Sequence, residues 1–224
     1  VDVGGESTRP GAAAVGVQQE IDRVVPVIEA LAVRTEAVLS VDASKPEVIA
    51  AALGAGAHLV NDIRALRMPG ALAAAAAQDA AVCVMHMQGK PATMQADPRY
   101  ADVVAEVREF LRARASACRE AGIAGDSICI DPGIGFGKTY QHNVELLRHQ
   151  RAFTDLGYPL LIGVSRKALI GIMTGRPARE RVVGSAVAAA FAVQAGAAII
   201  RVHDVAATVD AVKVAVALRG REAN

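Results

Sequence analysis

The residues best suited to bind a ligand are polar side chains that stand where short apolar runs of the sequence end. Asp42, Asn61 and Asp131 each lie at the end of such a run. A carboxylate that faces an N–H and an exocyclic NH2 group accepts two parallel hydrogen bonds, as it does from a guanidinium group. Asp131 and Asn61 therefore suit a flat heterocycle with an amidine-like edge.

A second group of such residues is cationic. Lys167, Arg201 and His203 follow two later apolar runs, and glycine-rich segments offer backbone N–H groups. Cations and backbone N–H groups together favour a phosphate or a carboxylate. The glycines at 133, 135 and 137 have the wrong spacing for a dinucleotide-binding loop, and the sequence holds neither a complete Walker-type motif nor a Gly-x-Ser-x-Gly elbow.

The apolar runs alternate with amphipathic segments along the whole chain. Strands are predicted at 1–3, 37–41, 58–60, 81–85, 127–130, 159–164 and 198–202. Helices are predicted at 17–33, 46–55, 70–79, 101–121, 141–154, 179–195 and 206–218. The strands show no polar–apolar alternation, which is typical of parallel strands buried on both faces. Strict strand–helix alternation predicts an α/β fold whose parallel sheet is either open or closed as a barrel.

In either arrangement the C-terminal ends of the strands lie at one face, where the active sites of such folds are built. Single residues also have simpler explanations. Asp42, Asp62 and Asp204 could cap helices, and Lys45 and Lys138 are expected to be solvated. These explanations do not account for carboxylates, an amide and cations gathering at one face, where charge is costly unless it serves a ligand.

The composition excludes several classes of partner. With 24 basic and 23 acidic residues the formal net charge is +1, and only 3% of the residues are aromatic, so no nucleic acid is expected as a partner. No apolar run reaches the roughly 18–20 residues that cross a bilayer. Cys83, Cys118 and Cys129 are too few for a disulfide framework, and no signal peptide is visible. We expect a cytoplasmic chain with buried, reduced cysteines.

Seven segments carry motifs whose order and spacing match those of one known family. They are Asp-Val-Gly-Gly-Glu-Ser-Thr-Arg-Pro-Gly (2–11), Ser-Val-Asp-Ala-Ser-Lys-Pro (40–46), Asn-Asp-Ile-Arg-Ala-Leu (61–66), Met-His-Met-Gln-Gly (85–89), Asp-Pro-Gly-Ile-Gly-Phe-Gly-Lys (131–138), Gly-Val-Ser-Arg-Lys (163–167) and Arg-Val-His-Asp-Val (201–205). Together they resemble the dihydropteroate synthase family. The Ser-Arg-Lys segment separates that family from the related pterin-dependent methyltransferases.

The resemblance implies a TIM-type (β/α)8 barrel that forms one domain over 1–224. The predicted elements make seven strand–helix units, and the family's first strand and its Asn-x-Thr-Pro-Asp-Ser-Phe-Ser loop have no counterpart here. A barrel of this type takes about 250 residues. We therefore expect about seven of the eight units.

The resemblance also implies an activity, the condensation of (7,8-dihydropterin-6-yl)methyl diphosphate with p-aminobenzoate to 7,8-dihydropteroate and diphosphate in folate biosynthesis. The implied pterin-binding residues are Asp42, Asn61, Asp131, Phe136, Gly163, Lys167 and Arg201. Those implied to bind p-aminobenzoate are Thr8, Arg9, Pro10, Phe136 and Ser165. Arg201 and His203 are implied to bind diphosphate, and Lys167, Arg201 and His203 to be catalytic.

Further properties follow from the resemblance alone. It implies Mg2+ as a cofactor, a homodimer, and inhibition by sulfonamides, which mimic p-aminobenzoate. The asparagine that usually binds Mg2+ lies in the loop without a counterpart, so no metal ligand is predicted in this chain. Two alternatives stay open: a truncated or non-catalytic chain that binds pterin without turnover, and a pterin-dependent methyltransferase.

Overall fold

The computed structural model describes residues 1–8 and 11–218. Its strands are β1 (Asp2–Gly4), β2 (Ser40–Asp42), β3 (Leu59–Asp62), β4 (Ala81–Met85), β5 (Ile128–Asp131), β6 (Leu161–Ile162) and β7 (Ile199–Ile200). Its helices are α1 (Val17–Ala32), α2 (Pro46–Gly54), α3 (Ala71–Ala76), α4 (Val103–Glu120), α5 (Tyr140–Arg148), α6 (Arg151–Thr154), α7 (Ala168–Thr174), α8 (Val182–Gln194) and α9 (Val205–Leu218). Short 3-10 turns, η1 (Gly125–Ser127) and η2 (Ala178–Glu180), precede β5 and α8.

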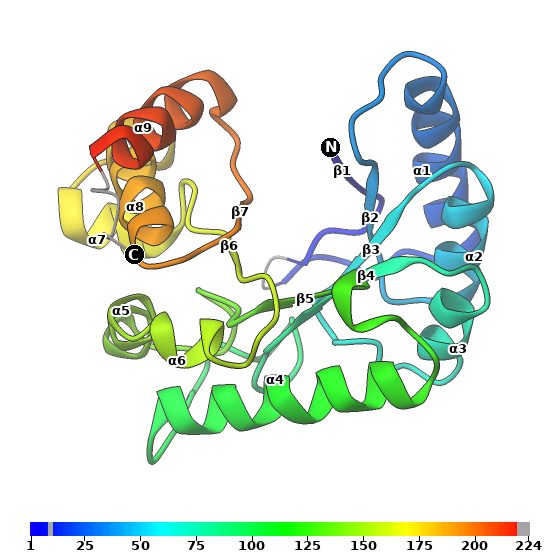
Figure 1. The fold of residues 1–224 in the computed structure, drawn as a ribbon, viewed down its shortest axis with the longest axis horizontal. Helices are drawn as coiled ribbons and strands as arrows, with labels where there is room; N and C mark the ends of the chain where they lie inside the picture. Colours follow the sequence, from blue (N-terminus) through cyan, green and yellow to red (C-terminus); the bar gives the residue numbers. More distant parts are fainter. Residues whose placement is uncertain (9–10, 219–224) are drawn as a thin grey trace, which may run out of the picture.

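The strands are parallel and follow one another in chain order. β1 to β5 form one sheet in the order β1-β2-β3-β4-β5, and β6 pairs with β7. A single bridge between Ile130 and Leu160 connects the two sheets. The helices surround the strands (Figure 1). This is the predicted TIM-type (β/α)8 arrangement, with seven strands present.

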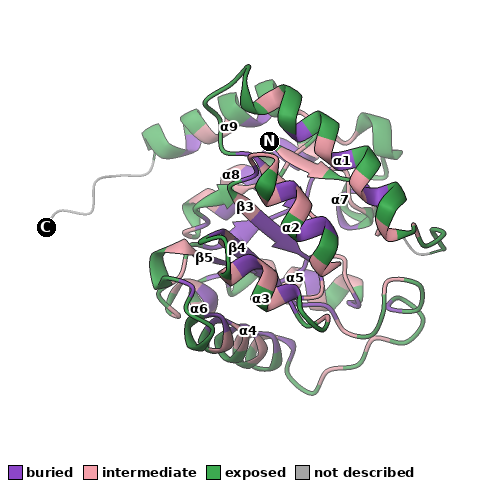
Figure 2. Cartoon of the chain, turned by 90° about the vertical axis from the view of Figure 1, so that its right-hand side faces the viewer, coloured by how far each residue is buried: buried purple, intermediate pink, exposed green. Residues whose placement is uncertain are grey.

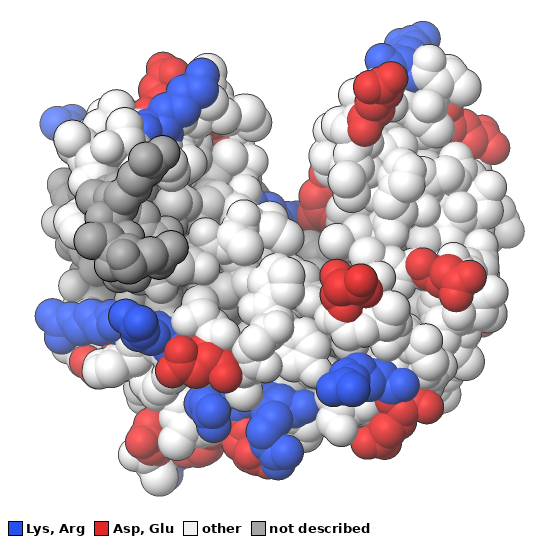
Figure 3. All heavy atoms as spheres, in the orientation of Figure 1, with Lys and Arg blue, Asp and Glu red and all other residues white. Residues whose placement is uncertain are grey.

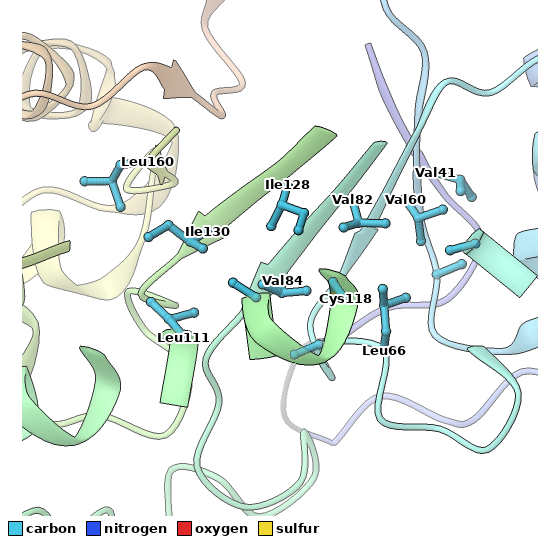
Figure 4. Close-up of a cluster of buried hydrophobic side chains, with 14 of the residues drawn as sticks. Val41, Val60, Leu66, Val82, Val84, Leu111, Cys118, Ile128, Ile130 and Leu160 are labelled. Atoms are coloured by element: carbon cyan, nitrogen blue, oxygen red, sulfur yellow. The ribbon is translucent and has the colours of Figure 1, made fainter. Parts of the chain in front are cut away.

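The main hydrophobic core lies between the strands and the helices. Val60, Val82 and Ile128 occupy neighbouring positions in the register of β3, β4 and β5, and all three are buried. Leu111 and Cys118 of α4 belong to the same cluster (Figure 4). Full burial of a side chain of this size contributes about 1.5–3 kcal/mol. Burial of these side chains fixes the register of the strands, and the register decides which residues stand at the strand ends.

The helices bury one face and expose the other (Figure 2). In α1 the buried residues Glu20, Val24 and Ile28 are spaced four apart, so they lie on one stripe turned toward the sheet. The three cysteines are buried and free, as predicted. No helix in the described parts of the chain is long and apolar enough to cross a membrane.

One side of the barrel is open. Within residues 1–8 and 11–218, β1 and β7 do not pair with each other. Figure 3 shows a deep notch between the side formed by α1 and the side formed by α8 and α9. Arg201, which follows β7, forms ion pairs with Asp2 of β1 and Asp42 of β2 on the other side of this opening.

Two helices differ from the sequence-based expectation. The helix predicted at 141–154 is broken at His149 and Gln150 into α5 and α6. The helix α7 was not predicted, although Gly175, with φ of +67° directly after it, is a common helix-ending signal. α7 buries Leu169 and Ile170 and begins directly after Lys167, so it helps to position that lysine.

Candidate active site

Residues from three strands meet at the C-terminal face of the sheet. Asp42 and Asn61 are register partners on β2 and β3. Asn61 Nδ2 donates to Asp2 Oδ2 of β1 at 3.1 Å. Arg201, which follows β7, donates from Nε to Asp2 Oδ2 at 2.5 Å and from Nη2 to Asp42 Oδ2 at 2.9 Å. The guanidinium group thus bridges the open side of the barrel.

Asp42 sits in an unfavourable place for a negative charge. Burial, followed by repulsion from Asp2, raises the pKa of Asp42 to about 7, although Arg201 opposes the shift. No role is predicted for Asp2 from the sequence. Its Oδ1 is buried and has no hydrogen-bond partner in the described structure. Asp2 is the first residue of β1, and the signal that could have identified it is a carboxylate within an otherwise apolar predicted strand.

Asp131 and Lys167 form the second part of the site. Asp131 is buried, and its Oδ1 accepts a hydrogen bond from the Gly133 N–H at 2.7 Å. Burial raises the pKa of Asp131, while Lys167, Lys138 and Arg201 act against that rise. Burial lowers the pKa of Lys167 to about 8, with Asp131 opposing. A carboxylate and an ammonium group therefore lie near each other in a place shielded from water.

The segment 133–137 shapes the wall next to Asp131. Lys167 Nζ donates to the Ile134 carbonyl at 2.5 Å and lies 4.8 Å from the centroid of the Phe136 ring. Gly133 has φ of +68°, and a Cβ atom there would lie 1.9 Å from the carbonyl oxygen of His86. Only glycine fits at this position, because both the backbone conformation and the close approach exclude a side chain.

Ser165 and His203 lie at the adjoining strand ends. The His203 N–H donates to Ser165 Oγ at 3.1 Å, and Ser165 Oγ lies 3.0 Å from His203 Nδ1. Arg166 pairs with Asp204 through two hydrogen bonds, one of them from Nε at 2.9 Å, and this pairing lowers the pKa of Asp204. These contacts hold the loop after β6 against the loop after β7.

Gly163 lies between two of the cations. A Cβ atom at this position would lie 3.8 Å from Lys167 Nζ and 3.8 Å from Arg201 Cβ. A Cβ atom would therefore meet both neighbours only in ordinary van der Waals contact.

Two pockets open beside these residues. The larger has a volume of about 530 Å3, and its lining includes Thr8, Phe136 and Lys167. The smaller, of about 230 Å3, is bordered by Thr8 and Asp42 among others. Thr8 thus borders both pockets. Arg9 and Pro10, predicted to act with it, lie outside the described residues.

Two lysines expected to be solvated are not. Lys138 is 3% exposed, and its Nζ lies 2.9 Å from His86 Nδ1. Lys45 Nζ donates to Glu6 at 2.7 Å and to the buried Glu20 at 2.5 Å. These contacts could not be predicted from the sequence, since each lysine is separated by tens of residues from its partner.

The helix-cap alternatives fail for two of the three aspartates. Asp62 accepts hydrogen bonds from the N–H groups of Arg64 and Leu66 in the loop after β3, well before α3 begins. Asp42 pairs with Arg201, and the N-cap position of α2 belongs to Lys45. Asp204 stands directly before α9, with its carboxylate engaged by Arg166.

The structure thus gathers the predicted residues at one face. Five strands contribute: β2 and β3 bring Asp42 and Asn61, β5 brings Asp131 at its end and Phe136 in the segment after it, and the segments after β6 and β7 bring the cations. Buried acceptors next to cations suit a planar, N–H-rich ring that carries an anionic group.

Comparisons with known proteins agree with this chemistry. The profile of the family described as "Pterin binding enzyme" matches residues 1–203. The dihydropteroate synthase of Escherichia coli is 52% identical over 214 residues, which are 96% of this chain and 76% of that protein. The dihydropteroate synthase of Haemophilus influenzae is 50% identical over 214 residues, which are 96% of this chain and 78% of that protein.

Solved structures give the same result. The Yersinia pestis dihydropteroate synthase, solved as a sulfonamide drug complex, has a TM-score of 0.95 at 50% identity. The match covers 97% of this chain and 79% of the Yersinia pestis chain. The Xanthomonas albilineans enzyme, in complex with 7,8-dihydropteroate, has a TM-score of 0.88 at 48% identity. The match covers 98% of this chain and 78% of the Xanthomonas albilineans chain. The chain therefore belongs to the dihydropteroate synthases of the pterin-binding enzyme family.

Proposed function

We propose that the chain is a dihydropteroate synthase that condenses (7,8-dihydropterin-6-yl)methyl diphosphate with p-aminobenzoate, giving 7,8-dihydropteroate and diphosphate. The observation that carries the proposal is one buried carboxylate, Asp131, close to two cations, Lys167 and Arg201. The pterin ring presents N–H groups and the diphosphate presents negative charge. A substrate that carries both groups therefore needs a carboxylate and cations close together in one site.

The pterin ring is held by groups at the strand ends. Asp131 and Asn61 pair with its polar edge, Asp42 lies beside them, and Arg201 stacks over its face. Gly163 leaves room for the ring, and Phe136 borders it. The buried position of Asp131 supports this assignment, because a hydrogen bond to a buried charge discriminates more strongly than one in water.

The reaction exchanges one bond of the methylene carbon for another. The amine nitrogen of p-aminobenzoate forms the new C–N bond, the C–O bond to diphosphate breaks with its electron pair, and the amine loses a proton. The electron-rich dihydropterin stabilises positive charge on the methylene carbon. Lys167, Arg201 and His203 stabilise the negative charge, and no side-chain nucleophile is needed.

The second substrate binds next to the Phe136 ring. Thr8, Phe136 and Ser165 contact p-aminobenzoate, together with Arg9 and Pro10. The pocket of about 530 Å3 lined by Thr8, Phe136 and Lys167 supports this position. Sulfonamides, which mimic p-aminobenzoate, bind the same place.

Mg2+ accompanies the diphosphate in this proposal. The residues that the structure describes form no group of three or more His, Cys, Asp or Glu side chains able to hold a metal ion. Mg2+ characteristically keeps several water ligands and binds through substrate phosphates, so a dedicated protein site is not required. None of the steps above depends on it. Titration with EDTA and re-addition of Mg2+ measures the dependence.

Three further properties belong to the proposal. The chain forms a single domain, acts in the cytoplasm, and associates as a homodimer. Support for the dimer comes from exposed apolar residues on α8, among them Val183 and Phe191, whose burial against a second copy would be favourable.

The alternatives differ in their products. A pterin-dependent methyltransferase would transfer a methyl group, and the Ser165-Arg166-Lys167 segment disfavours it. A non-catalytic chain would bind pterin without releasing diphosphate.

The test is diphosphate release by the purified 224-residue chain, given the dihydropterin diphosphate, p-aminobenzoate and Mg2+. We expect release that requires p-aminobenzoate and yields dihydropteroate in equal amount. Pterin binding by a folded chain without release would support the non-catalytic alternative.

A further inference from the structure

Lys138 is a buried cation that the proposed reaction does not use. Its side chain is 3% exposed, and in the described structure it has no carboxylate within ion-pair distance. Instead its Nζ lies 2.9 Å from His86 Nδ1, 3.0 Å from the Phe136 carbonyl oxygen and 3.3 Å from the His86 carbonyl oxygen. Burying an ammonium group without a counter-ion is unfavourable, and burial lowers the pKa of Lys138 to about 7, so the retention of this lysine calls for an explanation.

His86 acts as the acceptor in this contact. Burial, with Lys138 and Arg67 adding to it, lowers the pKa of His86 to about 3, so the ring is neutral near pH 7. When Lys138 is protonated its ammonium group can only donate, so Nδ1 accepts and the proton of the neutral ring is on Nε2. The ring packs edge-on against Phe110 at a centroid distance of 4.9 Å. His86 is therefore a fixed acceptor for Lys138.

The Phe136 carbonyl ties this pair to the active site. Lys138 binds the carbonyl of Phe136, while Lys167 binds the carbonyl of Ile134 and lies over the Phe136 ring. The two lysines thus hold the same turn at two points.

Other side chains complete the support of this turn. The Gly135 N–H donates to Asn143 Oδ1 at 2.6 Å, and the Tyr100 hydroxyl donates to the Gly137 carbonyl at 2.8 Å. The turn also rests on the His86 carbonyl, which leaves no space for a side chain at Gly133. Lys138 lines the 530 Å3 pocket together with Phe136, as Lys167 and Asn143 also do.

We propose that Lys138, held by neutral His86, is a positioning residue that fixes the Phe136 turn and thereby the face against which p-aminobenzoate binds. This inference rests on the proposed function. Asp131 and Asn61 stand on strands whose positions the core fixes, so loss of Lys138 affects p-aminobenzoate more than the pterin.

The test compares Lys138→Met with Lys213→Met, a matched replacement of an exposed lysine on α9. The readout is the dissociation constant of p-aminobenzoate, measured by calorimetry on chain saturated with a pterin and diphosphate, so it does not require turnover. We expect Lys138→Met to raise this constant at least tenfold and the pterin constant less than threefold. The melting temperature should change by only a few degrees, because removing a buried ammonium offsets the lost hydrogen bonds.

A second pair of variants separates positioning from folding. His86→Gln keeps a side-chain acceptor for Lys138, whereas His86→Leu does not. Tighter p-aminobenzoate binding in His86→Gln than in His86→Leu, at similar melting temperatures, is the expected result.

Several outcomes would overturn the inference. One is equal p-aminobenzoate affinity in Lys138→Met and Lys213→Met. Another is a parallel loss of both ligands together with stability, which would mean a structural role only. Diphosphate release by the unaltered chain is measured separately, so failure of the proposed function is recognised independently of these binding constants.

Discussion

Asp131 is the single residue on which pterin recognition depends most in our proposal. Replacing it with Asn puts an NH2 group where an acceptor faces the N–H edge of the ring. We expect Asp131→Asn to weaken pterin binding about 10- to 100-fold, since a mispaired buried hydrogen bond loses about 1–3 kcal/mol. Calorimetry with a pterin measures this, with Asp126→Asn, an exposed carboxylate in η1, as the control. Unchanged affinity in Asp131→Asn would refute the assignment.

Arg201 and Thr8 have different roles in our proposal, and substitutions at the two positions can be compared. Arg201 stabilises the leaving diphosphate, while Thr8 only borders p-aminobenzoate in our proposal. Loss of one preorganised group that stabilises transition-state charge lowers kcat by about 100- to 1,000-fold. We expect Arg201→Ala to lower kcat by such a factor and Thr8→Ala to act mainly on the KM for p-aminobenzoate. Steady-state kinetics would contradict the diphosphate role if Thr8→Ala had the larger effect on kcat.

Asp42 makes stability depend on pH. Its pKa in the folded chain is raised to about 7, above the ordinary value of 3.8. Between about pH 4 and pH 7 the unfolded chain ionises this group while the folded chain keeps it protonated, so its contribution to stability is present below pH 4 and lost as pH rises to 7. We expect Asp42→Asn to raise the melting temperature at pH 8 by several degrees and to leave it unchanged at pH 4.

Thermal melts of both proteins across this pH range provide the measurement. An increase that is the same at pH 4 and pH 8 would assign the effect to packing rather than to ionisation. The variant is also expected to bind pterin less well, because it loses a group that lies against the ring.

The turn after β5 is the structural element most sensitive to substitution. Gly133 and Gly122 both have positive φ, but a Cβ atom at Gly122 meets open space, whereas one at Gly133 meets the His86 carbonyl. Gly122→Ala should therefore lose about 1 kcal/mol of unfolding free energy from strain alone. Gly133→Ala should lose at least about 3 kcal/mol or fail to fold. Urea denaturation compares the two, and equal losses would show that the turn can move.

The strands and their polar ends could be predicted because the signal is local. Apolar runs such as Ala81–Met85 are continuous, and the residues after them reach one face in any parallel sheet. The pairing of Arg201 with Asp2 could not be predicted, since the two residues are 199 positions apart and meet only when the folded chain brings the end of β7 opposite β1. The contact between Lys138 and His86 was hidden for the same reason, at a separation of 52.

At the scale of the whole molecule, α8 exposes large apolar side chains on its surface. Phe191 is 71% exposed and Val183 is 75% exposed. If this surface forms the proposed dimer, Phe191→Glu should shift the protein from dimer to monomer, because a charge in an apolar interface is unfavourable. Sedimentation velocity measures the shift, with Val33→Glu at the end of α1 as the control. A monomeric parent chain would rule out the dimer.

The bridge from Arg201 to Asp2 and Asp42 has a consequence for the turnover cycle. In our proposal the leaving diphosphate binds Arg201, so Asp2 and Asp42 would lose their cation and Asp42 would be favoured in its protonated form. When diphosphate departs, Arg201 has partners waiting within hydrogen-bond distance. If Arg201 binds diphosphate as proposed, the two carboxylates compete with this product for the same cation, and we expect this competition to favour diphosphate release.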